Sequence, residues 1–162
     1  MIQRIQTIYL LIVLIMMSMT LTCNLATFTL ADAAQSGIPS EVTFKALGIS
    51  DGEHTTNIKA TMSLGILASL TAALAFISIV SFKKRLFQVR LCAMQMVLLV
   101  GAIGYTIYYL INMTKMMDSV GDYATHISVV NGAPLIALLF ARLAMKAILR
   151  DEYLVRGADR IR

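Results

Sequence analysis

The chain of 162 residues is 58% hydrophobic and only 14% charged, and its mean hydropathy is +0.76. Soluble globular proteins carry about 25% charged residues, and disordered chains are poor in apolar residues, so this composition excludes both classes. We therefore expect an integral membrane protein whose first partner is the lipid bilayer.

Four long stretches of the sequence lack charged side chains. They cover residues 5–31, 60–82, 91–114 and 123–141. Each is long enough to cross a bilayer, because about 20 helical residues span roughly 30 Å of hydrocarbon. The sequence therefore predicts an all-α membrane protein with a single domain, an antiparallel bundle of four transmembrane helices. The expected spans are about 5–25, 60–82, 91–113 and 124–146.

The charged residues between these spans are sorted by sign. With the N-terminus inside, the inner segments hold 11 Lys and Arg against three acidic residues, and the outer segments hold three against six. Lys and Arg near short loops are retained in the cytoplasm. We therefore expect a bacterial inner-membrane protein with both termini cytoplasmic, a short extracytoplasmic loop at about 26–59 and a cytoplasmic tail at about 147–162. The positive net charge follows from this sorting, so nucleic acid is not an expected partner.

The outer loop has one segment with strand-like composition. Residues 42–47 and 27–30 are rich in β-branched and aromatic residues, so a short hairpin between them is a candidate. The loop is too small to fold alone and should rest on the helix ends. In the fourth span, Pro134 removes a backbone donor, which predicts a kink in the helix.

The two ends of the chain carry its most distinctive residues. The sequence opens with MIQRIQTIYLL at 1–11, and APLIALL at 133–139 precedes RDEYLVR at 150–156. Together these segments resemble an uncharacterised family of four-span inner-membrane proteins of Bacteroidota, filed as a domain of unknown function. The resemblance implies an integral inner-membrane protein and no established activity.

Both distinctive ends should face the cytoplasm, as should the basic turn between the second and third spans. We expect a docking surface there, for a protein partner or for the other terminus of the same chain. The simpler alternative is anchoring to lipid headgroups, because Arg142, Lys146 and Arg150 recur every four residues on one helix face. The candidate residues are Gln3, Arg4, Gln6, Lys83, Lys84, Arg85, Arg90, Arg150, Asp151, Glu152, Arg156, Asp159 and Arg160.

The spans offer little that points to a reaction. No charged side chain falls at mid-depth, and no HExxH, CxxC or phosphate-binding glycine loop occurs in the sequence. The polar residues there are Gln95 and a stripe of Tyr105, Tyr108 and Asn112, which favours hydrogen bonds between helices over a substrate path. We therefore expect no enzyme, no cofactor and no catalytic residue.

Two patterns suggest a metal, and each has a simpler interpretation. Met16, Met19 and Cys23 share a helix face and offer soft ligands for copper, although the chain has 11 Met that also fill packing gaps. Asp118, Asp122 and His126 would align only on a continuous helix, where a turn is expected. We expect no metal site from either pattern.

The function most consistent with these features is that of an accessory or scaffolding subunit in a membrane complex. Its partner would be another membrane protein or further copies of the same chain, as a homo-oligomer. The alternatives are a small oligomeric transporter or channel, and a protein that handles copper through its Met and Cys residues.

Overall fold

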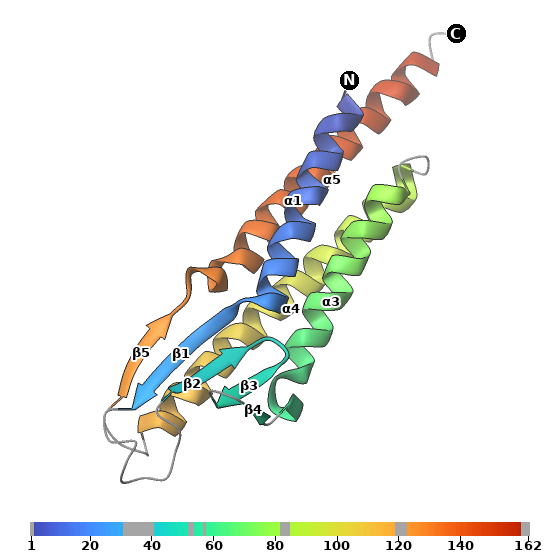
Figure 1. Ribbon diagram of the computed structural model, residues 1–162. Helices are drawn as coiled ribbons and strands as arrows, with labels where there is room; N and C mark the ends of the chain where they lie inside the picture. The colour runs from blue at the N-terminus through green and yellow to red at the C-terminus, as the bar shows by residue number, and fades with distance from the viewer. Residues whose placement is uncertain are drawn as a thin grey trace.

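The computed structural model describes residues 2–30, 41–51, 54–56, 58–81, 85–118 and 123–159. Within these ranges, four long helices form a bundle, and a five-stranded sheet lies at one end of it (Figure 1). The terminal end of the bundle, where α1 begins and α5 finishes, is the end away from the sheet (Figure 1). The helices are α1 (Ile2–Thr22), α3 (Ile58–Val80), α4 (Arg85–Asp118) and α5 (Ala133–Asp159).

All four helices are long and apolar enough to cross a membrane, as the sequence predicted. The apolar windows are Ile5–Thr22, Thr61–Val80, Leu86–Lys115 and Val129–Val155. Large apolar side chains point outward from the bundle; Phe76 is 58% exposed and Val97 is 72% exposed. Such surface is costly in water and suits lipid, so the chain has the form of a multi-pass membrane protein.

Each helix turns one narrow stripe of side chains toward its neighbours. Within a stripe the buried residues recur at alternating spacings of three and four, the 3.5-residue repeat of helices that pack side by side. We call these the inner stripes. They consist of Gln6, Leu10, Val13, Met17 and Thr20 on α1; Thr61, Leu64, Ala68, Thr71, Ala75 and Ser78 on α3; Gln88, Cys92, Gln95, Leu99, Ala102 and Thr106 on α4; and Ala137, Ala141, Ala144, Ile148 and Asp151 on α5.

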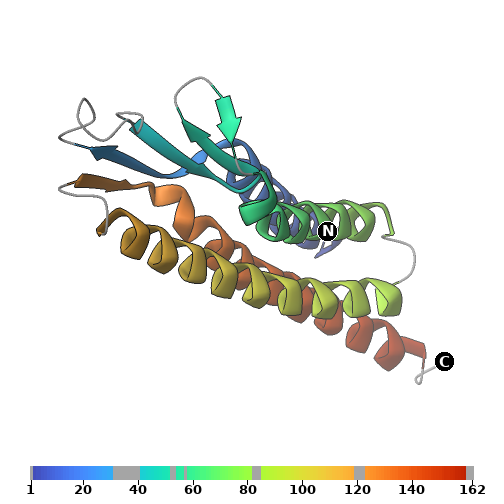
Figure 2. The same ribbon diagram turned by 90° about the horizontal axis from the view of Figure 1, so that it is seen from below.

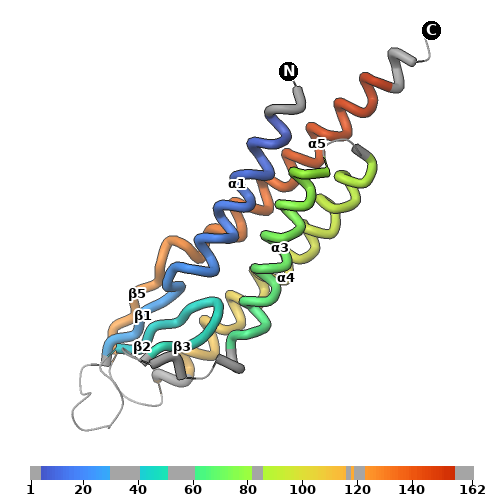
Figure 3. Tube along the Cα trace, turned by 45° about the vertical axis from the view of Figure 1, so that its right-hand side comes forward, coloured from blue at the N-terminus to red at the C-terminus, as the bar shows by residue number. Residues whose placement is uncertain are grey.

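The helices contact one another in the cyclic order α1, α3, α4, α5. The pair α1 and α5 runs side by side over most of its length (Figure 3). Ala137 and Ala141 of α5 lie in one buried cluster with Val13 and Met17 of α1. Small side chains let helix backbones approach closely, and close contact is what holds helices together in lipid, where apolar burial gives no advantage.

The sheet is built from the two chain segments that join α1 to α3 and α4 to α5. Its strands are β1 (Asn24–Leu30), β2 (Glu41–Lys45), β3 (Gly48–Asp51), β4 (His54–Thr56) and β5 (Tyr123–Ile127). Their order is β4-β3-β2-β1-β5, with every neighbouring pair antiparallel. Seen from below, the sheet continues the layer of α1 and leans over the end of α4 (Figure 2).

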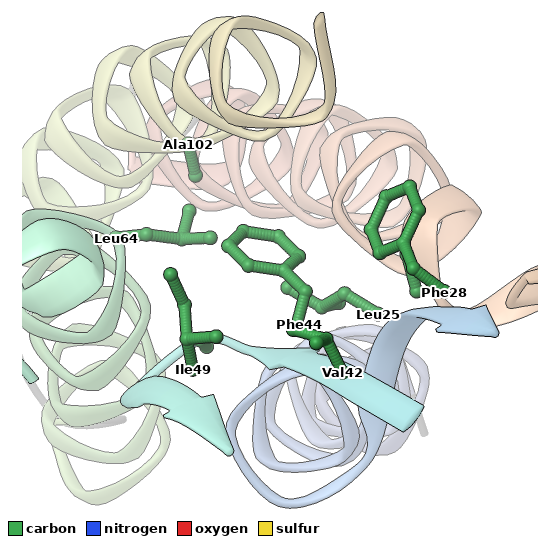
Figure 4. Packing of buried hydrophobic residues seen from close by; sticks show 9 residues of the cluster. Leu25, Phe28, Val42, Phe44, Ile49, Leu64 and Ala102 are labelled. Atoms are coloured by element: carbon green, nitrogen blue, oxygen red, sulfur yellow. The ribbon is translucent and has the colours of Figure 1, made fainter. Parts of the chain in front are cut away.

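One face of the sheet packs against the helix ends. In β2 the side chains of Val42 and Phe44 are buried, whereas Glu41 is exposed and Thr43 is half-buried. This alternation is the two-residue period of a strand. Phe44 points toward Leu64 of α3 and Ala102 of α4 (Figure 4). The predicted hairpin is confirmed, since β1 and β2 pair, and so is the expectation that the loop rests on the helix ends.

The prediction of an all-α fold is wrong, because the predicted outer loop at 26–59 contributes four of the strands. These strands are short, and their apolar side chains find a core only against α3 and α4. A hydropathy pattern dominated by four membrane spans does not display such a small sheet.

The predicted start of the fourth span is also wrong. The segment Tyr123–Ile127 is strand β5, which pairs with β1, and a 3-10 turn, η1 (Val129–Gly132), separates it from α5. Pro134 is the second residue of α5, where a helix needs no donor, so the predicted kink does not arise. The Asn131 Nδ2 atom donates hydrogen bonds to the carbonyl oxygens of Leu25 (2.7 Å) and Ser128 (3.0 Å), which tie η1 to β1.

The turn between β2 and β3 sits directly on the backbone of α3. A Cβ atom added at Gly65 would lie 2.7 Å from Leu47 Cδ2 and 2.9 Å from the carbonyl oxygen of Ala46. The leucine can rotate away, but the carbonyl belongs to the turn itself. Only a residue without a side chain therefore fits at this contact between the sheet and the bundle.

We predict that Gly65→Ala lowers stability by about 1–3 kcal/mol, because overpacking must displace the turn. Gly104→Ala is the matched control, since a Cβ atom there meets nothing within 4 Å. The control should gain up to about 1 kcal/mol from better helix propensity. Thermal unfolding in detergent, followed by circular dichroism, measures both. Equal midpoints for Gly65→Ala and the natural chain would mean that the turn does not rest on α3.

Candidate functional site

The first candidate surface lies at the terminal end, where α1 and α5 meet. The Gln6 Nε2 atom donates a hydrogen bond to the Ala147 carbonyl oxygen at 3.2 Å. The rings of Tyr9 and Phe140 are 5.9 Å apart between centroids. The structure therefore brings the two distinctive ends of the sequence together, with part of each buried against the other.

The predicted docking residues divide into inward, outward and undescribed groups. Gln6 and Asp151 are buried members of the inner stripes, Glu152 is half-buried, and Arg90 and Arg150 are exposed. Two of the polar residues proposed as a surface thus face the interior of the bundle. For Gln3, Arg4, Arg85, Arg156 and Asp159 only the backbone is described, and Lys83, Lys84 and Arg160 lie outside the described residues.

A groove of about 940 Å³ runs along the outer side of this contact. We call it the α1/α5 groove. Lys146 and Arg150, one turn apart on α5, are exposed in its wall, and the described lining residues include no carboxylate. The lining consists of Ile5 and Tyr9 from α1 and of Leu143, Lys146, Ala147, Leu149, Arg150, Tyr153 and Leu154 from α5.

Sequence reasoning found only the basic residues of this groove. Tyr9 and Tyr153 were missed, because their common surface depends on α1 lying beside α5. The spacing of Ile5 and Tyr9 by four residues was the available signal, since residues four apart share one helix face.

The second candidate surface is a hollow of about 520 Å³ on the outer face of α4, lined by Gly101, Gly104, Tyr105 and Tyr108. We call it the α4 notch. It lies on the side of α4 opposite the inner stripe and in the half of the membrane window Leu86–Lys115 that is nearer the sheet. A Cβ atom at Gly104 would meet nothing within 4 Å. The backbone of α4 is therefore open to a neighbour at this depth.

The aromatic wall of the α4 notch is fixed from behind by Tyr109. The Tyr109 hydroxyl hydrogen-bonds to the Ser63 hydroxyl of α3 at 2.7 Å. Its ring stacks on Tyr105 with centroids 6.1 Å apart, and the ring of Tyr108 meets it edge-on at 5.6 Å. The sequence predicted a hydrogen bond between helices for the stripe of Tyr105 and Tyr108, but the structure gives it to Tyr109.

Gln95 is the polar group most deeply enclosed at mid-depth. Its side chain is fully buried in the inner stripe of α4, and neither its Nε2 nor its Oε1 atom has a hydrogen-bond partner among the described residues. Burying an amide without partners is costly.

The acidic pattern of Asp118, Asp122 and His126 considered from the sequence is not assembled as one helix face. Asp118 ends α4 and His126 lies in β5, so the continuous helix that would align them does not exist, and Asp122 is outside the described residues. The Tyr123 hydroxyl donates to Asp118 Oδ1 at 2.7 Å, and this bond raises the pKa of Tyr123. Cys23 follows the end of α1, and Met19 is 41% exposed. The described residues contain no group of three or more His, Cys, Asp or Glu placed to hold a metal.

Comparison with known proteins assigns the chain to a family whose function is not known. No curated protein matches it. A family model described as "Domain of unknown function (DUF4293)" matches residues 2–161, which is nearly the whole length. The chain therefore belongs to the DUF4293 family.

Proposed function

We propose that the protein is an accessory or scaffolding subunit of a complex in the bacterial inner membrane. The α4 notch carries this proposal, because it is an open hollow with fixed walls within the membrane window of α4. Its occupant would be a transmembrane helix of another membrane protein or of a second copy of the chain.

The physics of the bilayer favours a helix in such a hollow. Lipid tails are as apolar as leucine, so helices associate through close packing and hydrogen bonds rather than through burial from water. Gly101 and Gly104 allow backbone approach, and the exposed Tyr105 and Tyr108 can donate hydrogen bonds from either side. A disordered lipid chain gains less from these features than a rigid helix does.

The interior of the bundle supports the same proposal. Apart from the Gln95 amide, the described inner stripes contain small or apolar side chains and no charged group at mid-depth. A single copy therefore has no charged path through its centre. Its chemically distinctive surfaces face outward, as expected for a protein that works by contact.

The test of the α4 notch is Gly104→Leu, which fills the hollow with a side chain that lipid tolerates. We expect this variant to lose the partner that co-purifies with the natural chain in mild detergent. Cross-linking with mass spectrometry and native gel migration measure the loss. Because the inner stripe is untouched, the variant should keep its helix content.

Ala93→Leu is the matched control, since Ala93 is also exposed on α4 but lies outside the notch. It adds the same bulk on the same helix and should retain the partner. Retention of the partner by Gly104→Leu, at the level of the control, would show that the notch is not the contact.

We further propose that both termini face the cytoplasm. Lys146 lies at the middle of α5 and Arg150 in the half nearer the terminal end, and Lys and Arg are retained inside. The sheet would then lie outside the cytoplasm, on the outer surface of the membrane.

Cysteine labelling tests this orientation. In a Cys23→Ser and Cys92→Ala background, Thr125→Cys marks the exposed strand β5 and Tyr153→Cys marks the terminal end. In intact spheroplasts, a maleimide that cannot cross membranes should label Thr125→Cys only, and lysis should open Tyr153→Cys to labelling. The reverse pattern would overturn the proposed orientation.

A small oligomeric transporter remains the second candidate, favoured by the buried amide of Gln95. A polar group without partners inside a membrane bundle is retained at a cost, and water or a substrate could satisfy it during transport. An accessory subunit needs no water or substrate to form hydrogen bonds with this amide. The two functions therefore differ in what replacing Gln95 should do.

For an accessory subunit we predict that Gln95→Met stabilises the protein by about 1 kcal/mol or more, because the unpaired amide is removed at similar volume. Gln88→Met is the control; Gln88 is also buried, but its Nε2 atom donates to the Ser78 carbonyl oxygen at 3.1 Å. That variant should be destabilised. Thermal unfolding in detergent compares them, and a destabilised Gln95→Met would favour a hydrated interior and hence transport.

A further inference from the structure

The lining of the α1/α5 groove combines cationic, phenolic and aliphatic side chains. Lys146 and Arg150 supply the charge, and Tyr9 and Tyr153 supply hydroxyl groups. Aliphatic side chains form the remainder, among them Ile5 and Leu143. The three chemistries suit an amphiphile better than a soluble ligand or a purely apolar one.

The depth of the groove follows from the helix lengths. With a rise of about 1.5 Å per residue, Arg150 lies roughly 26 Å along α5 from its start at Ala133, which is next to the sheet. Ile5 lies about as far along α1 from Thr22 at the sheet end. Since hydrocarbon is about 30 Å thick, both residues sit where the tails give way to headgroups. Lys, Arg and Tyr side chains favour this boundary.

Among the described residues that line the groove, no side chain carries a negative charge. Asp151 belongs to the inner stripe on another side of α5, and Glu152 is not a lining residue. The two cations are exposed and one turn apart, so both can reach a single anionic group. Tyr153 is 74% exposed, and its hydroxyl is free to turn toward the same group.

We propose that the α1/α5 groove binds an anionic phospholipid. Lys146 and Arg150 hold the phosphate, and an acyl chain lies against Ile5 and Leu143. The volume of about 940 Å³ is within the range of about 300–1,000 Å³ for small-molecule sites, so the groove takes the headgroup and the upper part of a chain. A water-soluble acidic peptide fits less well, because the deeper part of the groove lies in hydrocarbon. The inference does not depend on the partner proposed for the α4 notch, because the two surfaces share no residue.

The test uses the full-length chain in mild detergent, with phosphatidylglycerol as the probe and native mass spectrometry as the readout. The variant Lys146→Gln with Arg150→Gln removes both cations of the groove. The control variant Arg90→Gln with Arg142→Gln removes the same charge from exposed residues outside the lining. All four side chains are exposed, so both variants should fold, and gel filtration verifies this.

We expect the groove variant to bind phosphatidylglycerol roughly 10- to 30-fold more weakly, because two interfacial cations are removed. The control should change by less than about twofold. Phosphatidylcholine should bind more weakly than phosphatidylglycerol, and inorganic phosphate should not compete, because the chain contact belongs to the lipid.

Three results would overturn the proposal. Equal weakening in both variants would indicate diffuse attraction to any basic surface, and competition by inorganic phosphate would indicate a site for a free anion. Loss of a cross-linked protein from the groove variant, with lipid binding unchanged, would assign the groove to a polypeptide. Loss of the partner from Gly104→Leu bears on the α4 notch alone, so failure of either proposal is recognisable separately.

Discussion

The constraint on which the structure depends is that helices in lipid must hold together without expelling water. Each backbone satisfies its own hydrogen bonds, so association rests on close and regular packing of side chains. The inner stripes meet this constraint with a 3.5-residue repeat sustained along all four helices. On α5 the stripe is largely alanine, from Ala137 to Ala144, and this is the helix that lies along α1. Because the stripes close the interior, the groove and the notch are both on outer surfaces.

The sheet determines which helices become neighbours. β1 follows α1 after Cys23, and β5 leads into α5 through η1, so the pairing of β1 with β5 places these two helices side by side at the sheet end. Asn131 strengthens this junction through its hydrogen bond to Leu25. The same alignment, carried along the bundle, brings Gln6 to Ala147 and forms the α1/α5 groove at the opposite end. A strand pair at one end of the bundle thus shapes a surface at the opposite end.

The sequence predicts the helices well and their contacts poorly, for physical reasons. Spans α1, α3 and α4 follow from length and hydropathy, because any helix must cross the same thickness of hydrocarbon. The segment 124–132 was assigned to a helix because it is uncharged and continuous with the fourth span. Uncharged residues suit a strand equally well, and only pairing with β1 decides between the two. Asp151 was placed on a surface, although its spacing from Ala144 and Ile148 continues the buried stripe and was readable. The spacing of Tyr9 from Ile5 places the two on one helix face, but the proximity of Tyr9 and Tyr153 depends on the tertiary contact of distant segments, which spacing does not reveal.

The two outward surfaces differ in the force that selects their occupant. The α4 notch lies within the membrane window, in the half nearer the sheet, and its described lining residues carry no charge, so shape and hydrogen bonding decide what fits, and salt has little influence. The α1/α5 groove lies at the boundary with water, where the field of Lys146 and Arg150 reaches over about a Debye length and weakens as ionic strength rises. The proposed helix and the proposed lipid would therefore occupy separate surfaces, one on α4 and one between α1 and α5. If both proposals hold, raising ionic strength weakens the lipid contact alone and so separates the two without any substitution.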